Sequence, residues 1–359
     1  MNKLVIIGNG FDLAHGLETR YSDFLLWEIN EAFKQTNIVK PSSFHIESPL
    51  FAIESNYRIC QHPSLDPCEF EDIAGFLQYL KDNKDGRLII KIKYSYSFVE
   101  HLIQFANRNW VDIEREYFRE LVKISTFNGN EESKNKMLSN LNQSVDLIRV
   151  ELKNYLSVKN IISFDVNNEI KRNFFEINNR NKLDQTNSTL ILNFNYTDTA
   201  EKYLPNPNIQ INYIHGKLKD SKNPLIFGYG DEMDENYEKI EKLYNNDYLK
   251  HMKSFAYLQT ANYRNLFEFL DKKNQKFDVF IMGHSCGLSD RLLFTHIFEH
   301  SNFNSVQIYY YAKPDGTNDF FEKTQEISRY FRLDSKHKMR KCLVPFNESK
   351  PLTQFKPQN

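Results

Sequence analysis

A short apolar run that ends in a glycine-rich turn constrains the fold of this chain more than any other feature. Residues 4–7, Leu-Val-Ile-Ile, contain no polar side chain, and Gly8-Asn9-Gly10 follows at once. A continuous apolar run of this length suits a strand buried on both faces of a parallel sheet. The spacing becomes helical after Gly10, so the opening predicts a strand, a tight turn and a helix.

Similar strand signals return in the second half of the chain, separated by stretches with helical spacing. They lie at residues 189–194, 209–214, 224–227, 277–282 and 306–312. Because strands that alternate with helices favour a parallel sheet, we predict an α/β fold with a doubly wound, mainly parallel, Rossmann-like sheet. The sheet would be built from residues 1–30 and 187–345, with a large helical insertion at 31–186 and a polar tail at 346–359.

The composition is that of a globular chain with enough apolar residues for a core. Of the 359 residues, 40% are hydrophobic and 26% are charged, and the formal net charge is −1. A chain-wide basic field is absent, so nucleic acid is not an expected partner. No apolar stretch approaches the roughly 20 residues that span a bilayer, and no signal peptide precedes the first strand, so we expect a cytoplasmic protein without membrane contact. The four cysteines form no C-x-x-C pair, which argues against structural zinc.

The turn after the first strand is the first candidate binding site. One glycine allows a sharp turn, a second lets the backbone approach a phosphate or ribose, and the following helix offers free N–H groups. The match to a dinucleotide fingerprint is imperfect, because Leu13 occupies the third glycine position. The carboxylate of Asp12 would repel a phosphate, so Asp12 either accepts hydrogen bonds from ribose hydroxyls or caps the helix. Nucleotide binding is favoured over a purely structural turn, and the residues assigned to it are Gly8, Asn9, Gly10, Phe11, Asp12 and Gly16.

Polar residues also follow three later strands of the predicted sheet. Ligands of open α/β sheets bind beyond the carboxyl ends of strands, although turn chemistry or helix capping explains each segment equally well on its own. A histidine at this edge has the pKa range for proton transfer near neutral pH. The candidates are Asn195, Tyr196 and Asp198 after one strand, His215 after the next, and Gly283, His284, Ser285 and Asp290 after a third.

Two further patterns are less specific. Residues 296–300, His-Ile-Phe-Glu-His, match the H-x-x-E-H pattern of a zinc protease group, but so short a pattern also arises by chance. Glu114, within the predicted insertion, either reaches over the site or solvates a helix face.

The opening of the chain closely resembles the start of AbiH proteins, a family of bacterial abortive-infection proteins. The resemblance rests on residues 8–17, Gly-Asn-Gly-Phe-Asp-Leu-Ala-His-Gly-Leu, and continues in order through segments 110–114, 193–198, 214–216 and 283–285. It covers most of the chain and implies a role in defence against phage.

AbiH-like sequences in turn resemble the sirtuin-like NAD-binding group at a low level. This second resemblance implies that Gly8, Gly10 and Gly16 line a dinucleotide site. It also implies that Asn195 contacts the nicotinamide-side ribose, that His215 acts on a ribose hydroxyl, and that the adenosine half lies along Ser285 and Asp290. The chain departs from the group at Asp12, where a small hydroxyl residue is common. It also lacks the zinc-binding cysteine pairs of deacetylases, which argues against protein deacetylation.

Together these features predict an abortive-infection effector that binds NAD and hydrolyses its nicotinamide–ribose bond, with Asn195 and His215 as catalytic residues and no metal. Two alternatives stay open. One is a regulatory protein that binds a nucleotide without turnover, and the other is a nuclease that uses Asp12, Glu114 and Asp290 with a divalent metal. A phage-derived trigger, a partner protein and a homo-oligomer are all compatible with the sequence, which specifies none of them.

Overall fold

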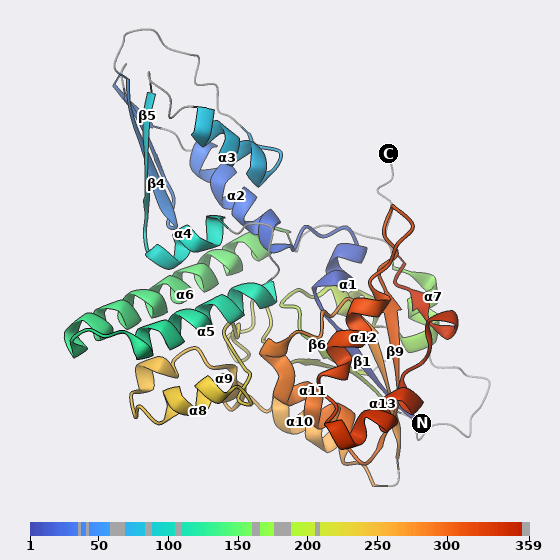
Figure 1. Cartoon of the computed structure of the whole chain (residues 1–359). Coiled ribbons are helices and arrows are strands. Elements are labelled where there is room, and N and C mark those ends of the chain that lie inside the picture. The colour runs from blue at the N-terminus through green and yellow to red at the C-terminus, as the bar shows by residue number, and fades with distance from the viewer. Residues whose placement is uncertain are drawn as a thin grey trace. The chain divides into compact units, whose positions relative to one another are not determined.

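Two units make up the chain (Figure 1). Unit 1 comprises Met1–Thr19, Leu156–Leu243 and His251–Asn359, and unit 2 comprises Arg20–Tyr155 and Tyr244–Lys250. The computed structural model describes residues 1–34, 37–40, 43–57, 69–82, 88–104, 110–159, 166–175, 188–204, 209–273 and 275–353.

A six-stranded sheet forms the centre of unit 1, and every neighbouring pair of its strands is parallel. In spatial order the strands are β10 (Lys350–Pro351), β9 (Phe303–Tyr310), β8 (Phe277–Met282), β1 (Asn2–Ile7), β6 (Thr189–Asn193) and β7 (Ile209–Tyr213). The chain starts at β1 in the middle, adds β6 and β7 on one side, and returns to add β8, β9 and β10 on the other. This is the strand order of the Rossmann fold, so the predicted doubly wound, parallel sheet is confirmed.

Both faces of this sheet are buried. In β1, Leu4 and Ile6 belong to one core and Val5 and Ile7 to the other, and all four are fully buried. Burying each such side chain contributes about 1.5–3 kcal/mol, which explains the absence of polar residues in this run. The first core includes helices α10 (Asn262–Leu270), α11 (Arg291–Glu299) and α12 (Phe320–Ser328). The second includes α1 (Asn9–Ala14), α7 (Asn168–Ile170), η1 (Lys171–Phe175) and η2 (Thr199–Tyr203).

Unit 2 combines helices with a four-stranded antiparallel sheet. The strands pair in chain order as β2 (Asn37–Lys40), β3 (Ser43–Glu47), β4 (Phe51–Tyr57) and β5 (Leu88–Tyr94). The helices are α2 (Tyr21–Lys34), α3 (Ile73–Asp82), α4 (Ser97–Gln104), α5 (Trp110–Thr126) and α6 (Glu131–Lys159), the last of which passes into unit 1 at Leu156.

The helical spacing of residues 31–186 therefore accounts for only part of the structure there. The sequence of β5, Leu-Ile-Ile-Lys-Ile-Lys-Tyr, alternates in its second half with the period of two that is typical of a strand. That pattern is too short to stand out among longer helical stripes. Residues 43–57 contain β3 and β4, whereas 41, 42 and 58–67 lie outside the described residues.

Two expectations near the site and at the end of the chain need correction. Residues 224–227 form no strand; they are an extended segment in which the N–H of Ile226 donates to the carbonyl of His215 (2.8 Å). The apolar composition of this segment predicted a paired strand, but the N–H of Ile226 donates to the turn at His215 instead of to another strand. The tail predicted as polar at 346–359 is in part paired and buried, because β10 pairs with β9 and Leu352 is buried against the second core; residues 354–359 lie outside the described residues.

The other helical segments are short: α8 (Glu235–Glu241), η3 (Asn246–Tyr248), α9 (Lys253–Tyr257), η4 (Leu288–Asp290), η5 (Leu333–Ser335), α13 (Lys336–Cys342) and η6 (Phe346–Glu348). Across the described ranges, no helix is both long enough and apolar enough to cross a bilayer.

Candidate functional site

Two glycine turns meet where the strand order changes direction, between β1 and β8. The N–H of Gly10, after β1, donates to the carbonyl of Gly283, after β8 (2.8 Å). A Cβ on Gly8 would lie 2.5 Å from the Cα of His284, and a Cβ on Gly283 would lie 2.1 Å from the nitrogen of Phe11. Gly283 also has a φ of +71°. The contact between the two turns therefore requires these glycines.

The backbone N–H groups expected to bind a phosphate instead donate hydrogen bonds within the protein. Besides Gly10, Phe11 donates to the carbonyl of Gly8 (2.8 Å). Gly8 is the N-cap residue of α1, so Asp12 does not cap this helix; it lies in the first turn, where a carboxylate complements the positive end of the helix. Asn9 accepts a hydrogen bond from Thr19 (2.5 Å). Gly16, at φ +79°, has open space where a Cβ would be.

Asp12 is the centre of the first polar group, the Asp12 cluster, which comprises Asp12, Asn195, Thr197 and Thr199. The hydroxyl of Thr197 donates to Oδ2 of Asp12 (2.6 Å) and accepts from Thr199 (3.2 Å). Nδ2 of Asn195 donates to the carbonyl of Gly8 (3.0 Å). Oδ1 of Asp12 is buried and has no hydrogen-bond partner among the described residues. Burial raises the pKa of Asp12 to about 6, and the Thr197 hydroxyl opposes this shift.

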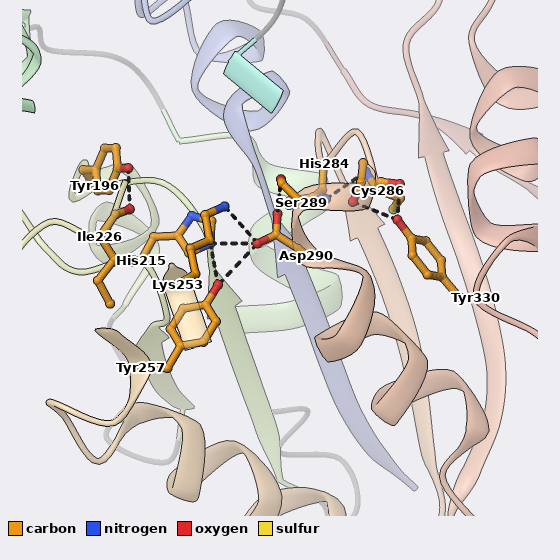
Figure 2. Close-up of polar contacts among 11 residues, drawn as sticks. Tyr196, His215, Ile226, Lys253, Tyr257, His284, Cys286, Ser289, Asp290 and Tyr330 are labelled. Carbon is orange, nitrogen blue, oxygen red and sulfur yellow. Dashed lines mark hydrogen bonds and ion pairs between the residues drawn. The ribbon is translucent and has the colours of Figure 1, made fainter. Parts of the chain in front are cut away.

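Asp290 is the centre of the second group, the Asp290 cluster, which comprises His215, Lys253, Tyr257, Ser289 and Asp290 (Figure 2). Oδ1 of Asp290 lies 3.1 Å from Nε2 of His215, 3.1 Å from Nζ of Lys253 and 3.3 Å from the Tyr257 hydroxyl. Ser289 donates to Oδ2 (3.2 Å). Asp290 stands at the N-cap position of α11 but makes no capping bond, because its carboxylate is turned to this cluster.

The charge of Asp290 determines which ring nitrogen of neutral His215 carries the proton. Burial alone would raise the pKa of Asp290, but Lys253 and His215 outweigh it, and the pKa lies well below its usual range. A carboxylate only accepts hydrogen bonds, so the bond to His215 places the imidazole proton on Nε2. Nδ1 makes no hydrogen bond to the residues that the structure describes. In the neutral ring, Nδ1 is therefore the proton acceptor.

The turn after β8 is held by its own set of hydrogen bonds. Nδ1 of His284 accepts from the N–H of Cys286 (2.9 Å), and Lys323 donates to the His284 carbonyl (2.7 Å). Tyr330 donates to the carbonyls of Cys286 and Gly287. Burial lowers the pKa of His284 to about 3, so this imidazole is neutral and supports the turn.

Phe194 connects the ends of the strands that carry these groups. Its ring centroid lies 4.9 Å from that of His215 and 4.2 Å from that of His284, and Asn195 of the Asp12 cluster follows it directly. Both clusters thus form at the carboxyl edge of the sheet, where ligands of this fold bind. His215 and Asn195 each keep 7% of their surface exposed, whereas Asp12 keeps 1%.

Comparison with protein families identifies the chain. The family model described as "Bacteriophage abortive infection AbiH" matches residues 4–312. The chain belongs to the AbiH family. The resemblance inferred from the motifs is confirmed, and the family gives the chain a role in bacteriophage abortive infection. Neither the curated proteins nor the solved structures contain a match.

Four further predicted residues of this AbiH chain are not members of the two clusters as defined above. The Tyr196 hydroxyl donates to the carbonyl of Ile226 (2.8 Å) and so holds the segment beside His215. Asp198 precedes η2 without capping it. Ser285 is exposed. Glu114 lies on α5 of unit 2 and is buried.

The residues of the H-x-x-E-H pattern at 296–300 do not form a set of metal ligands in the part of the AbiH chain that is described. His300 follows the end of α11 and pairs with Asp271 (3.1 Å), whereas His296 contacts the Tyr263 hydroxyl (3.2 Å). Within the described ranges, no three His, Cys, Asp or Glu side chains are placed to hold a metal ion.

Lys253, Tyr257 and Thr197 were not predicted as site residues. Lys253 and Tyr257 lie on the five-residue α9, outside any strand end, and nothing in their local sequence indicates burial against an aspartate. Thr197 stands between Asn195 and Asp198, which were both predicted as site residues. Its position in this polar segment could therefore have indicated it.

Proposed function

We propose that this AbiH chain hydrolyses the bond between nicotinamide and ribose in NAD, and that the loss of NAD arrests the infected cell. One observation carries the proposal: His215, at the carboxyl edge of a Rossmann-type sheet, is paired with the buried carboxylate of Asp290. Nucleotides bind at this edge in sheets of this strand order, and a histidine oriented by a carboxylate is a common general base.

The chemistry follows from the orientation of the imidazole. The C1′–N bond breaks with its electron pair going to the nicotinamide nitrogen, and a water oxygen bonds to C1′. The water gives up a proton, which Nδ1 of His215 accepts while Nε2 stays bonded to Asp290. The negative charge of Asp290 stabilises the imidazolium that forms, and the buried surroundings strengthen this effect.

Asn195 is assigned to positioning the ribose or the water. Its amide is fixed by the hydrogen bond to the Gly8 carbonyl (3.0 Å), and a fixed amide can hold a hydroxyl without losing orientation during the reaction. The same bond ties Asn195 to the glycine turn after β1.

The proposal is tested by measuring NAD in phage-infected cells that carry the wild type, His215→Gln or Asn195→Ala. His296→Gln is the matched control, since His296 is an exposed histidine of unit 1 outside both clusters. We expect NAD to collapse with the wild type and the control, and to stay level with the other two variants.

Protection against phage at constant NAD would overturn the hydrolase. If that protection still required His215, and the purified chain bound a nucleotide without turnover, regulatory nucleotide binding would replace hydrolysis. If chelation of divalent metal abolished protection, the nuclease would replace both.

A further inference from the structure

The segment 244–257 leaves unit 2 and enters unit 1 within a few residues, and both halves make specific contacts. Tyr244–Lys250 belongs to unit 2. There, Nδ2 of Asn142 on α6 donates to the carbonyl of Asp247 (2.8 Å), and Lys250 pairs with Asp146 on α6 (2.8 Å). Asn142 is itself held by the Tyr117 hydroxyl (3.0 Å) and is buried. Helix α6 therefore anchors the first half.

The second half contributes two of the groups that surround Asp290. Lys253 and Tyr257 lie on α9 and contact Oδ1 of Asp290 at 3.1 and 3.3 Å. The backbone is fixed as well, because Tyr229 donates to the carbonyl of His251 (3.1 Å) and accepts from the N–H of Lys253 (2.8 Å). This half of the segment therefore sets the charge and the orientation of Asp290.

Few residues separate the two anchors. From Lys250 to Lys253 there are three Cα–Cα steps, which span at most about 11 Å when fully extended. A displacement of Lys250 that stretches this short connection to its limit therefore moves Lys253 as well. Asp290 would then lose the only lysine contact that it has in the described structure, and its hold on the proton of His215 would weaken.

We propose that unit 2 regulates the His215–Asp290 pair through the segment 244–257, with Lys253 as the positioning residue. While α6 holds this segment, Lys253 keeps Asp290 ionised and Asp290 keeps the proton of His215 on Nε2. A partner that displaces residues 244–250 from α6 withdraws Lys253, and His215 loses its orientation. The effect on turnover rests on the function proposed above, whereas the coupling itself is a property of the protein without substrate.

The test uses hydrogen exchange of the Lys253 amide and ¹⁵N NMR of His215 in the full chain. Asn142→Ala removes the buried anchor, and Lys250→Met removes only the exposed pair. Gln143→Ala is the matched control, because Gln143 is exposed on α6 and its side chain bonds to Tyr96 and Ser139 rather than to Asp247 or Lys250. We expect exchange of the Lys253 amide to become about tenfold faster in Asn142→Ala, as loss of a buried hydrogen bond predicts. Lys250→Met should show a smaller increase, and the control should match the wild type.

The His215 spectrum separates coupling from catalysis. We expect a single tautomer with the proton on Nε2 in the wild type, a mixture in Lys253→Met, and restoration of the wild-type spectrum in Lys253→Arg. Unchanged exchange of the Lys253 amide in both Asn142→Ala and Lys250→Met would overturn the proposal, as would a wild-type tautomer in Lys253→Met. If both readouts respond while no variant alters NAD, the coupling stands and only the hydrolase is lost.

Discussion

The two buried aspartates at the carboxyl edge of the sheet have opposite surroundings. Asp12 contacts neutral hydroxyl groups, and burial raises its pKa to about 6. Asp290 is equally buried, yet Lys253 and His215 lower its pKa. Burial alone therefore does not determine how tightly a carboxyl group holds its proton; a neighbouring cation reverses the shift.

This contrast assigns different tasks to the two residues. Asp290 carries a permanent negative charge, which a group that orients a base requires. Asp12 gains or loses a proton in weakly acidic solution, close to the range in which a group can exchange protons during a reaction. Titratable groups whose pKa values are pushed apart within one site often mark acid and base roles.

The largest expected effect comes from removing the charge of Asp290. Asp290→Asn leaves the ammonium group of Lys253 buried beside a neutral amide, and we expect a loss of about 3–5 kcal/mol in the free energy of unfolding. Adding Lys253→Met should recover most of the loss, because a buried ion pair contributes little net stability. Urea unfolding of the single and double variants measures both. A double variant as unstable as Asp290→Asn would show that Lys253 is not the stranded partner.

The next effect is a pH dependence that belongs to Asp12. Its pKa is 3.8 in the ordinary state and about 6 when folded, so the folded chain binds more protons than the unfolded chain between these values. The contribution of Asp12 to stability is therefore fully present below pH 4 and falls by about 3 kcal/mol as the pH rises through 6. The difference in unfolding free energy between the wild type and Asp12→Asn, measured from pH 4 to 7, should show this slope.

Asp290 should give the opposite sign in a different range. Its pKa is lowered on folding, so its contribution is present above pH 4 and disappears below it. A difference between the wild type and Asp12→Asn that stays constant from pH 4 to 6 would contradict the raised pKa of Asp12.

A smaller effect tests whether the Thr197 hydroxyl moderates the proton affinity of Asp12. Thr197→Val removes the donor 2.6 Å from Oδ2 and should raise the pKa of Asp12 further. We expect about 1–1.5 kcal/mol of destabilisation at pH 8, where Asp12 is ionised, and less at pH 4. Thr199→Val should act in the same direction but less strongly, since the Thr199 hydroxyl donates to Thr197 and also lowers the pKa of Asp12. Equal losses at both pH values would contradict an effect on the charged form.

The smallest effect is expected at Ser289. Its hydroxyl lies 3.2 Å from Oδ2 of Asp290, which keeps its contacts with Lys253, His215 and Tyr257. Ser289→Ala should cost less than about 1 kcal/mol and leave the His215 tautomer unchanged. If it weakened the protein as much as Asp290→Asn does, the lysine would not be the dominant partner.

The sequence predicted which segments form the site better than it predicted which of their residues contact one another. The opening strand and turn were recognisable because an apolar run that ends at Gly8 is typical of a buried strand followed by a tight turn. His215 and Asp290 were each found at a strand end, but they are 75 positions apart, and their pairing depends on which strands become neighbours. Lys253 was missed because a buried lysine has no local signature. A still larger separation of 185 positions hid the bond between Thr197 and Asp12, and with it the contrast in pKa.

The last described residues protect the outer side of the sheet. Lys350–Pro351 and Leu343–Val344 run along β9, and the N–H of Leu352 bonds to the carbonyl of Tyr310 (2.7 Å). Without them, the eight residues of β9 would offer unpaired backbone groups to any other extended chain, and such edges promote aggregation. Pro351 has no N–H to extend the sheet further. A segment outside residues 4–312, which the family model matches, thus covers the edge that β9 would otherwise expose.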